Sequence, residues 1–351
     1  SFIRKHTERK FLYNSAMIGV TSLTLWVSLI YFSTDLLFLL LSLLLLHFTE
    51  KRRIYKNTSW LYIGLTGAAL YLCKAYGLPF FAAAFILILV REFISEGKMR
   101  KQLIGTGVRA LAVFVAASGI WIGILSVNYG FFTTGSAGGY NQSLVGPEMR
   151  HHATDYMGLI SPPNETALSA WEDISLVEVP RWSPFDSRES MVYQINLISH
   201  NFLVIWRNFK HFTFLSTIIL FLGLLYFIQK GRSIWSDNLS LYFIVSLTLV
   251  SGYSIIVCET RYLWLIAYLL LFSSVALLDY FAARINPNRV VSLLTVLLLT
   301  AGFVKTPVLD LKRHFQSDME VQALFAQYDS FHADGRIASV GDWRESLDLI
   351  F

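Results

Sequence analysis

The sequence predicts an all-α fold: a polytopic transmembrane helix bundle with a large non-cytoplasmic loop and the start of a C-terminal soluble domain. Three observations support this prediction. Hydrophobic residues make up 54% of the 351 residues and charged residues only 15%, so lipid must surround most of the chain. The apolar residues form uninterrupted runs, many close to the roughly 20 residues that a membrane-spanning helix needs. Short clusters of Lys and Arg separate these runs, as expected for the loops of a membrane protein.

Nine apolar runs are predicted to cross the membrane as helices rather than barrel strands, because they do not alternate in polarity. They are residues 12–32, 34–49, 59–74, 76–92, 104–127, 211–229, 239–258, 262–282 and 289–305. The resulting divisions are helices at 1–127, a loop at 128–210, helices at 211–305 and a C-terminal segment at 306–351. Both ends of the chain look cut, and GRIASVGDWRESL is expected to begin a small domain that is truncated.

The basic clusters predict the orientation of the helices. RKHTERK, EKRRIYK, REFISEGKMRK, QKGR and ARINPNR fall on alternate sides of the predicted spans, so the positive-inside rule places them in the cytoplasm. The non-cytoplasmic face then carries the long loop, the C-terminal segment and the turns at Asp35, Lys74 and Glu259. The aromatic and acidic segment ALSAWEDISLVEVPRWSPFD of the long loop is expected to lie as short helices on the membrane surface, where residues such as Trp171 and Trp182 are favoured.

A charged side chain at the membrane edge is expected to have an ionic partner or a function, because its insertion into the membrane costs roughly 2.5 to 3.5 kcal/mol. Asp35, Lys74, Glu259 and Arg261 are four such residues on the predicted non-cytoplasmic side, and we expect them to border one cavity. Asp35 follows Ser33 and is either a helix cap or part of this site. Lys74 either extends to the interface or binds a phosphate with its ammonium.

The turn CETRY allows two interpretations. Glu259 and Arg261 either form an ion pair that fixes the turn, or Arg261 binds phosphate oxygens in a bidentate manner while Tyr262 lines the pocket. The nearby Gly64 and Gly67 are best explained by close helix packing.

The sequence contains no convincing motif for several other functions. His151 and His152 are adjacent and no third ligand follows at a recognised spacing, so an exposed pair is favoured over a metal site. TTGSAGGY matches no nucleotide-binding loop, and no hydrolase or zinc-protease motif is present. The net charge of +5 resides largely in the short loops, which argues against nucleic-acid binding. Cys73 and Cys258 are predicted to be packed thiols.

The order of several short motifs resembles membrane glycosyltransferases of the GT-C superfamily. The motifs are TDLLF before a basic loop, WLYIGLTGAAL leading to LCKAYG, ETRYL at a helix start, and IASVG followed by DWRES. They are most similar to the branch with the protein O-mannosyltransferases and the bacterial lipid A aminoarabinose transferase. The resemblance covers most of residues 11–350 and implies a GT-C-like protein of a bacterial or archaeal inner or plasma membrane.

The resemblance implies transfer of a sugar from a polyprenyl-phosphate donor to a lipid, glycan or protein acceptor on the non-cytoplasmic face. Donor, acceptor and membrane lipids are then the partners, and no metal or other cofactor is needed because the leaving group is already a phosphate. The substrate-binding residues that the resemblance implies are Asp35, Lys74, Glu259, Arg261 and Tyr262. The catalytic carboxylate of such enzymes lies in the first outer loop, which is expected upstream of Ser1, so the catalytic residue is unknown.

A multi-span transporter or flippase is the alternative, in which the same membrane-edge charges line a substrate path. Transporters often show interrupted helices in corresponding halves of the chain. This sequence shows a large outer loop and a polar C-terminal segment instead, which favours the transferase. A structural subunit without activity is the third possibility.

Overall fold

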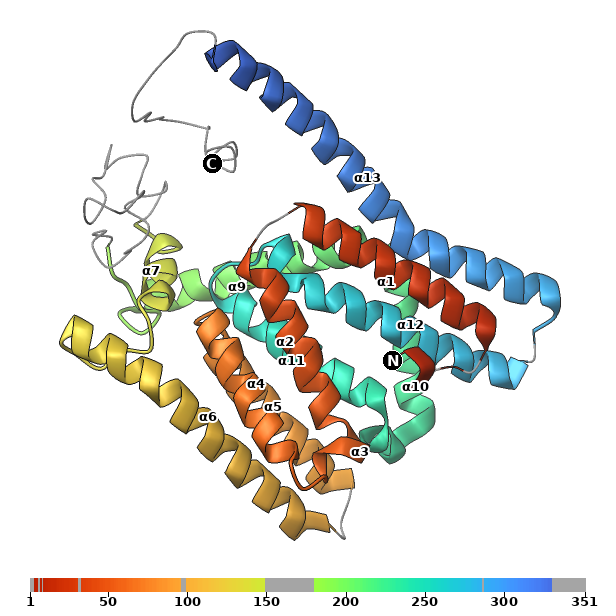
Figure 1. Cartoon of the computed structure of the whole chain (residues 1–351), viewed down its shortest axis with the longest axis horizontal. Helices are drawn as coiled ribbons and strands as arrows, with labels where there is room; N and C mark the ends of the chain where they lie inside the picture. Colours follow the sequence, from red (N-terminus) through yellow and green to blue (C-terminus); the bar gives the residue numbers. More distant parts are fainter. Residues whose placement is uncertain are drawn as a thin grey trace. The chain divides into compact units, whose positions relative to one another are not determined.

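The computed structural model describes residues 3–5, 7, 9–30, 33–95, 99–148, 180–285 and 287–329 (Figure 1). All regular elements within these ranges are helices, so the fold is all-α, as the sequence predicts. The elements are η1 (Ile3–Lys5), α1 (Lys10–Ile30), α2 (Thr34–Thr49), α3 (Lys51–Ile54), α4 (Ser59–Cys73), α5 (Gly77–Ser95), α6 (Arg100–Tyr129), α7 (Ala137–Leu144), α9 (Arg188–Phe212), α10 (Ser216–Lys230), η4 (Gly231–Ser236), α11 (Asn238–Ile255), η5 (Thr260–Leu263), α12 (Trp264–Ile285) and α13 (Arg289–Asp329).

Seven helices in the described part of the chain are long and apolar enough to cross a membrane. They are Lys10–Ile30, Gly77–Ser95, Arg100–Tyr129, Ser216–Ser236, Asn238–Ile255, Thr260–Ile285 and Arg289–Gln316. The apolar helices α2 and α4 are shorter, with 16 and 15 residues. Each of the nine predicted spans coincides with one of these helices. The protein is therefore a multi-pass integral membrane protein.

The last span differs from the prediction. The sequence predicts a helix that ends at residue 305, but α13 continues without interruption past Pro307 to Asp329. Proline removes one backbone hydrogen bond, and membrane helices tolerate this loss when neighbouring groups compensate. Next to it, the Thr306 hydroxyl donates to the carbonyl oxygen of His211 at 2.6 Å, which anchors this part of the helix. The small domain predicted from GRIASVGDWRESL lies outside the described residues.

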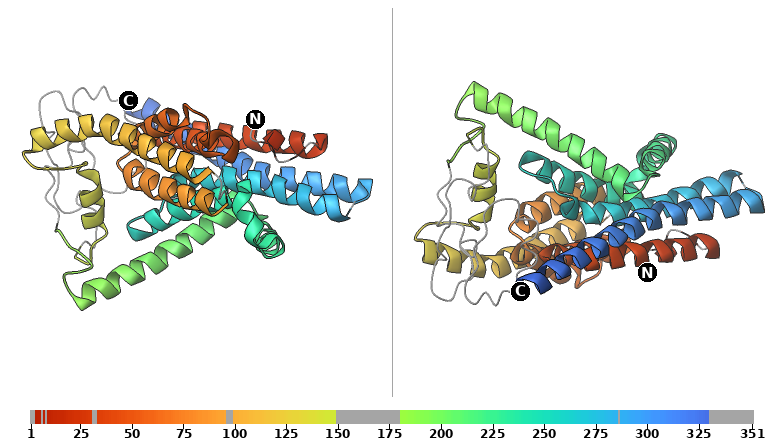
Figure 2. Two further views of the ribbon diagram at one scale, coloured as in Figure 1. Left: turned by 90° about the horizontal axis from the view of Figure 1, so that it is seen from below. Right: turned by 90° about the horizontal axis from the view of Figure 1, so that it is seen from above.

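The chain divides into two compact units, residues 1–135 with 197–309 and residues 136–196 with 310–351. In the first unit, α4 packs against α2, α5 and α6, and α5 packs against α11. The helix α12 contacts α1, α10 and α11. Both views of Figure 2 show α1 and α12 side by side with the first part of α13. These contacts place the ends of α2, α4, α5, α11 and α12 close together.

Two glycines allow the close packing around α4. A Cβ at Gly64 would lie 2.5 Å from the carbonyl oxygen of Ala110 on α6, and one at Gly67 would lie 2.6 Å from the ring of Phe81 on α5. Neither neighbour leaves space for a side chain, so both positions need glycine for packing. The packing interpretation of Gly64 and Gly67 is therefore confirmed.

In the second unit, α7 and the beginning of α9 fold onto each other. Trp182 donates its indole N–H to the carbonyl oxygen of Gln142 at 2.6 Å, and its ring meets that of Tyr193 edge-on at 5.5 Å. Tyr193 donates its hydroxyl hydrogen to the carbonyl oxygen of Val145 at 3.0 Å. This part of the predicted outer loop is therefore a packed structure. Trp171 lies outside the described residues.

Candidate functional site

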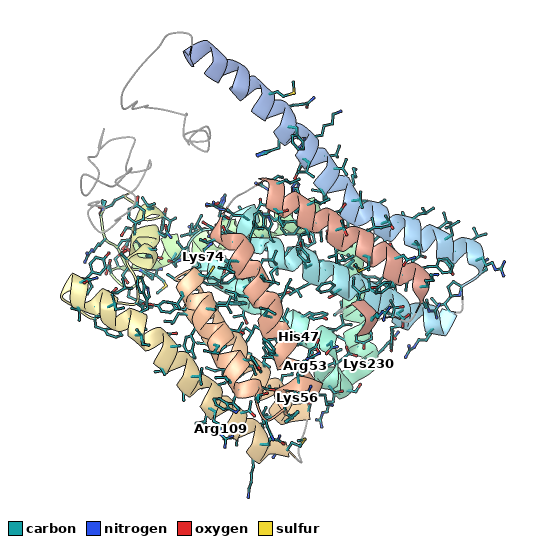
Figure 3. The ribbon with its side chains drawn as sticks, viewed as in Figure 1. His47, Arg53, Lys56, Lys74, Arg109 and Lys230 are labelled. Atoms are coloured by element: carbon teal, nitrogen blue, oxygen red, sulfur yellow. The ribbon has the colours of Figure 1, made fainter. Side chains whose placement is uncertain are left out.

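The charged residues nominated by the sequence lie at three helix junctions. Asp35 is in the first turn of α2, and Lys74 ends α4 just before α5. Glu259 immediately precedes η5, which contains Arg261. Figure 3 shows Lys74 at the opposite end of the helices from Arg53, which belongs to a predicted cytoplasmic loop. The junctions therefore meet at the end of the first unit that the sequence assigns to the non-cytoplasmic side.

Asp35 is the centre of this cluster. Its carboxylate is only 7% exposed, and Oδ1 accepts a hydrogen bond from the Lys74 ammonium at 2.6 Å. Oδ2 lies 3.8 Å from Nε of Arg261 and accepts a hydrogen bond from the Ser33 hydroxyl at 3.1 Å. Ser33 itself caps α2, because its hydroxyl oxygen accepts from the backbone N–H of Asp35. The cap is therefore Ser33, and the Asp35 carboxylate contacts two cations.

The turn between α4 and α5 holds Lys74 in place. The Lys74 carbonyl oxygen accepts from the N–H of Gly77 at 2.7 Å, and a Cβ at Gly77 would lie 2.1 Å from the carbonyl oxygen of Leu70. The Lys74 side chain is 22% exposed, and its Nζ lies 3.7 Å from the centroid of the Tyr262 ring. Burial lowers the pKa of Lys74, and the hydrogen bond to Asp35 partly offsets this effect. A lysine that simply extends to the interface would not be enclosed in this way.

Glu259, Arg261 and Tyr262 form the more exposed edge of the cluster. Nε of Arg261 lies 2.7 Å from Oε2 of Glu259, so the predicted ion pair is present. The Tyr262 hydroxyl donates to Oε1 of Glu259 at 3.1 Å. The side chains of Arg261 and Glu259 are 32% and 44% exposed, so solvent or a ligand can reach both. All five nominated residues are thus adjacent, and their role in substrate binding stays a prediction.

Two tyrosines that sequence reasoning missed extend the cluster inward. The Tyr253 ring stacks on Tyr262 at 4.7 Å with an interplanar angle of 15°, and Tyr76 lies 4.1 Å from Tyr253. The Tyr76 hydroxyl reaches the carbonyl oxygens of Thr248 and Leu249, both at 3.2 Å. Tyr253 is buried and its hydroxyl has no hydrogen-bond partner within the described part of the chain. Both tyrosines are close in sequence to the charged residues of the cluster, which could have indicated them: Tyr76 lies in KAYG, and Tyr253 shortly precedes CETRY.

This arrangement suits an anion attached to an apolar group. Lys74 and Arg261 supply positive charge at the ends of membrane helices, and Asp35 and Glu259 keep both cations in position without a ligand. Among the residues that the structure describes, no three His, Cys, Asp or Glu side chains are grouped as metal ligands would be. The pair at 151–152 lies outside them. The cavity predicted between the charged residues also stays a prediction.

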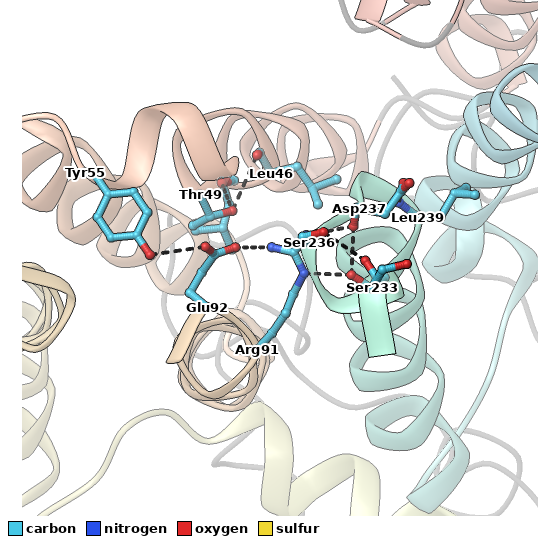
Figure 4. A network of polar contacts seen from close by, with 11 residues as sticks. Leu46, Thr49, Tyr55, Arg91, Glu92, Ser233, Ser236, Asp237 and Leu239 are labelled. Atoms are coloured by element: carbon cyan, nitrogen blue, oxygen red, sulfur yellow. Dashed lines mark hydrogen bonds and ion pairs between the residues drawn. The ribbon is translucent and has the colours of Figure 1, made fainter. Parts of the chain in front are cut away.

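A second charged cluster joins α5 to Tyr55 and to the start of α11 (Figure 4). Arg91 and Glu92 are fully buried neighbours on α5 and form an ion pair. Arg91 also donates to the Ser240 hydroxyl and to the carbonyl oxygen of Asp237, both at 2.7 Å. Tyr55 donates to Glu92 at 3.3 Å. In the sequence, Arg91 belongs both to the predicted span 76–92 and to the basic cluster REFISEGKMRK; α5 extends to residue 95, so Arg91 lies within the helix and is buried.

Asn201 connects α9 to the segment that carries the site. Its side-chain N–H groups donate to the carbonyl oxygens of Ser254 at 2.9 Å and Ile256 at 3.1 Å, where α11 ends. Asn201 is 5% exposed, so these carbonyls have little access to water as an alternative partner. The bonds fix the chain just before Cys258 and Glu259. Asn201 is therefore expected to position this segment.

Replacing Asn201 with alanine is expected to expose Cys258. Its thiol is buried, and burial raises its pKa to about 12, so it should react slowly with maleimides in the wild type. Loss of two buried hydrogen bonds should favour local opening by about 1 to 3 kcal/mol, and labelling should accelerate about ten- to a hundredfold. Labelling rates in a Cys73→Ser background measure this effect.

Asn208 provides a matched control on the same helix. It is also buried, at 7% exposure, but its side chain donates only within α9, to the carbonyl oxygen of Val204 at 3.0 Å. Asn208→Ala should leave the labelling of Cys258 near the wild-type rate. Equal acceleration in both variants would show that general loosening of α9, and not the bonds from Asn201, exposes the thiol.

The chemistry of the first cluster restricts the kinds of ligand but does not by itself identify a family. The two cations favour phosphate or carboxylate, and their place at the ends of apolar helices favours a ligand that also contacts lipid. Comparison with known protein families, curated proteins and solved structures finds no match.

Proposed function

We propose that this protein is a membrane glycosyltransferase that moves a sugar from a polyprenyl-phosphate donor to an acceptor on the non-cytoplasmic face. The observation that carries the proposal is the pair of cations, Lys74 and Arg261, that approach one buried carboxylate at the ends of membrane helices. A lipid-linked phosphate combines an anionic group with an apolar chain. The two cations can bind the anionic group of such a ligand, and the apolar membrane helices can contact its chain.

The proposed reaction breaks the bond between the sugar and the phosphate oxygen, and the acceptor hydroxyl replaces the phosphate. Negative charge accumulates on the departing phosphate, so cations next to it lower the barrier. Lys74 and Arg261 take this role. The acceptor hydroxyl must also give its proton to a base, a role that neither Lys74 nor Arg261 takes. No nucleotide is required, because the donor already carries its leaving group.

The remaining residues of the cluster orient these cations. Asp35 holds the Lys74 ammonium at 2.6 Å, and Glu259 holds Nε of Arg261 at 2.7 Å. Tyr262 lies beneath the ammonium and provides a flat surface that a cation favours. Asp35, Glu259 and Tyr262 are therefore assigned to positioning, and the two cations to direct contact with the phosphate.

Binding of polyprenyl phosphate by the purified protein tests the proposal. Polyprenyl phosphate should bind, whereas the same polyprenol without phosphate should bind much more weakly. Arg261→Gln should weaken binding of the phosphate about ten- to a hundredfold, as expected for loss of a charged hydrogen bond worth about 1.5 to 3 kcal/mol. Arg261→Lys should recover part of the affinity, because it keeps the charge but loses the planar geometry.

Arg109→Gln is the matched control, since Arg109 is exposed on α6 near the other end of the bundle. Its affinity for polyprenyl phosphate should equal that of the wild type. Equal binding of polyprenol and polyprenyl phosphate would contradict a phosphate site. Sugar transfer by the full-length protein in vesicles completes the test, and movement of the intact donor across the bilayer without transfer would support the transporter instead.

A further inference from the structure

A second pair of cations lies at the ends of α10 and α12. Lys230 is the last residue of α10, and Arg284 lies in the last turn of α12. The guanidinium of Arg284 lies 3.5 Å from the centroid of the Tyr280 ring, and Nζ of Lys230 lies 5.3 Å from the same centroid. Nζ of Lys230 also lies 5.5 Å from the ring of Tyr226, which meets Tyr280 edge-on at 4.5 Å. Two cations from different helices thus converge on one pair of aromatic rings.

A favourable interaction with helix dipoles explains why each helix ends with a cation, but it does not explain this convergence. Like charges repel, and neither cation has a carboxylate within 4.0 Å among the residues described. The acidic side chains nearby are engaged elsewhere. Asp237 accepts hydrogen bonds from the Tyr226 hydroxyl and from the N–H of Leu239, and Asp279 accepts from the Thr7 hydroxyl and lies 3.4 Å from Arg9.

The surroundings of the pair are apolar and exposed. Ile228 and Ile285, which neighbour the two cations in sequence, are 69% and 72% exposed. Such residues at the ends of membrane helices face acyl chains, while the cations beside them reach the level of the phosphate groups. Tyrosine is also favoured at this level of the bilayer. The site therefore combines positive charge, aromatic rings and an apolar surface.

We propose that Lys230 and Arg284, supported by Tyr226 and Tyr280, bind the phosphate of an anionic phospholipid. The phosphate lies between the two cations and neutralises their repulsion, and the acyl chains lie along α10 and α12. The arginine fork suits two phosphate oxygens, and the lysine supplies a point charge to a third. The basic loops predict that this lipid belongs to the cytoplasmic leaflet.

Thermal unfolding of the purified protein in a neutral detergent tests this site. Phosphatidylglycerol should raise the Tm of the wild type by about 4 °C relative to phosphatidylcholine when its concentration is well above its Kd. Lys230→Gln and Arg284→Gln should each lose more than half of this increase. Arg284→Lys, which keeps the charge, should retain more of it than Arg284→Gln and shows whether the position tolerates substitution.

Arg232→Gln is the control, because Arg232 is exposed and lies two residues after Lys230. It should keep the full increase in Tm. An equal loss in Arg232→Gln would show that diffuse surface charge, rather than this site, attracts the lipid. An equal increase with inorganic phosphate would assign the site to a soluble anion, and no increase in the wild type would overturn the proposal.

Discussion

Lys74→Ala is expected to remove most sugar-transfer activity, with a loss of about ten- to a hundredfold in rate. The reason is the lost contact with the donor phosphate, since one charge-assisted hydrogen bond is worth about 1.5 to 3 kcal/mol. Lys74→Arg should recover only part of the activity, because the guanidinium keeps the charge but changes its position. The measurement is transfer from a polyprenyl-phosphate sugar by the full-length protein. Lys56→Ala, an exposed lysine at the other end of α4, should keep the wild-type rate.

Misfolding must be separated from lost chemistry, because Lys74→Ala also removes the closest partner of the buried Asp35 carboxylate. The double variant Asp35→Asn/Lys74→Ala removes both charges and should be closer to the wild type in thermal stability. If the double variant is stable but still inactive, the charged pair is needed for transfer and not only for folding. Activity near that of the wild type in Lys74→Ala would contradict the phosphate role and leave Arg261 as the remaining candidate.

The pH profile provides an independent test of the same residue. Burial lowers the pKa of Lys74 below its ordinary value of 10.5, so the ammonium loses its proton at a lower pH than an exposed lysine. Wild-type activity should therefore fall as the pH rises through this lowered pKa. An arginine keeps its charge across this range, so the residual activity of Lys74→Arg should not show the same fall.

The membrane helices could be predicted because the solvent imposes simple requirements on the sequence. An apolar run of sufficient length must be helical in lipid, and charges mark its ends. The same requirement nominated Asp35 and Lys74, since a charge at the membrane edge needs a partner. Their pairing could not be predicted, because they are 39 residues apart and depend on how α2 and α4 pack.

Other residues of the two clusters were harder to predict from the sequence. The chain contains 17 tyrosines, and nothing in the local sequence distinguishes Tyr76 or Tyr253 from those that face lipid. Arg91 lies near the end of the predicted span 76–92 and begins the basic cluster REFISEGKMRK, so its burial could not be predicted; α5 continues to residue 95 and buries its guanidinium. The continuation of α13 past Pro307 was missed because the composition of the segment from about 306 is that of a soluble domain. Proline ends most helices in water, but contacts with neighbouring segments allow it within a membrane helix.

Arg91→Met is expected to destabilise the protein by about 3 to 5 kcal/mol, because it removes one member of the buried Arg91–Glu92 ion pair. It also removes the bonds to the Ser240 hydroxyl and the Asp237 carbonyl, which connect α5 to the start of α11. The free energy of unfolding in mixed micelles measures the effect. Arg109→Met should change it by less than about 0.5 kcal/mol, since that arginine is exposed.

The double variant Arg91→Met/Glu92→Leu separates the ion pair from the packing of the two side chains. Replacing both members of a buried pair with apolar residues is often close to neutral, so the double variant should be more stable than Arg91→Met alone. If the single variant remains within about 1 kcal/mol of the wild type, Glu92 is not the buried, charge-dependent group that the structure indicates. If the double variant is as unstable as the single one, the bonds from Arg91 to Ser240 and Asp237, rather than the charge left on Glu92, account for the loss.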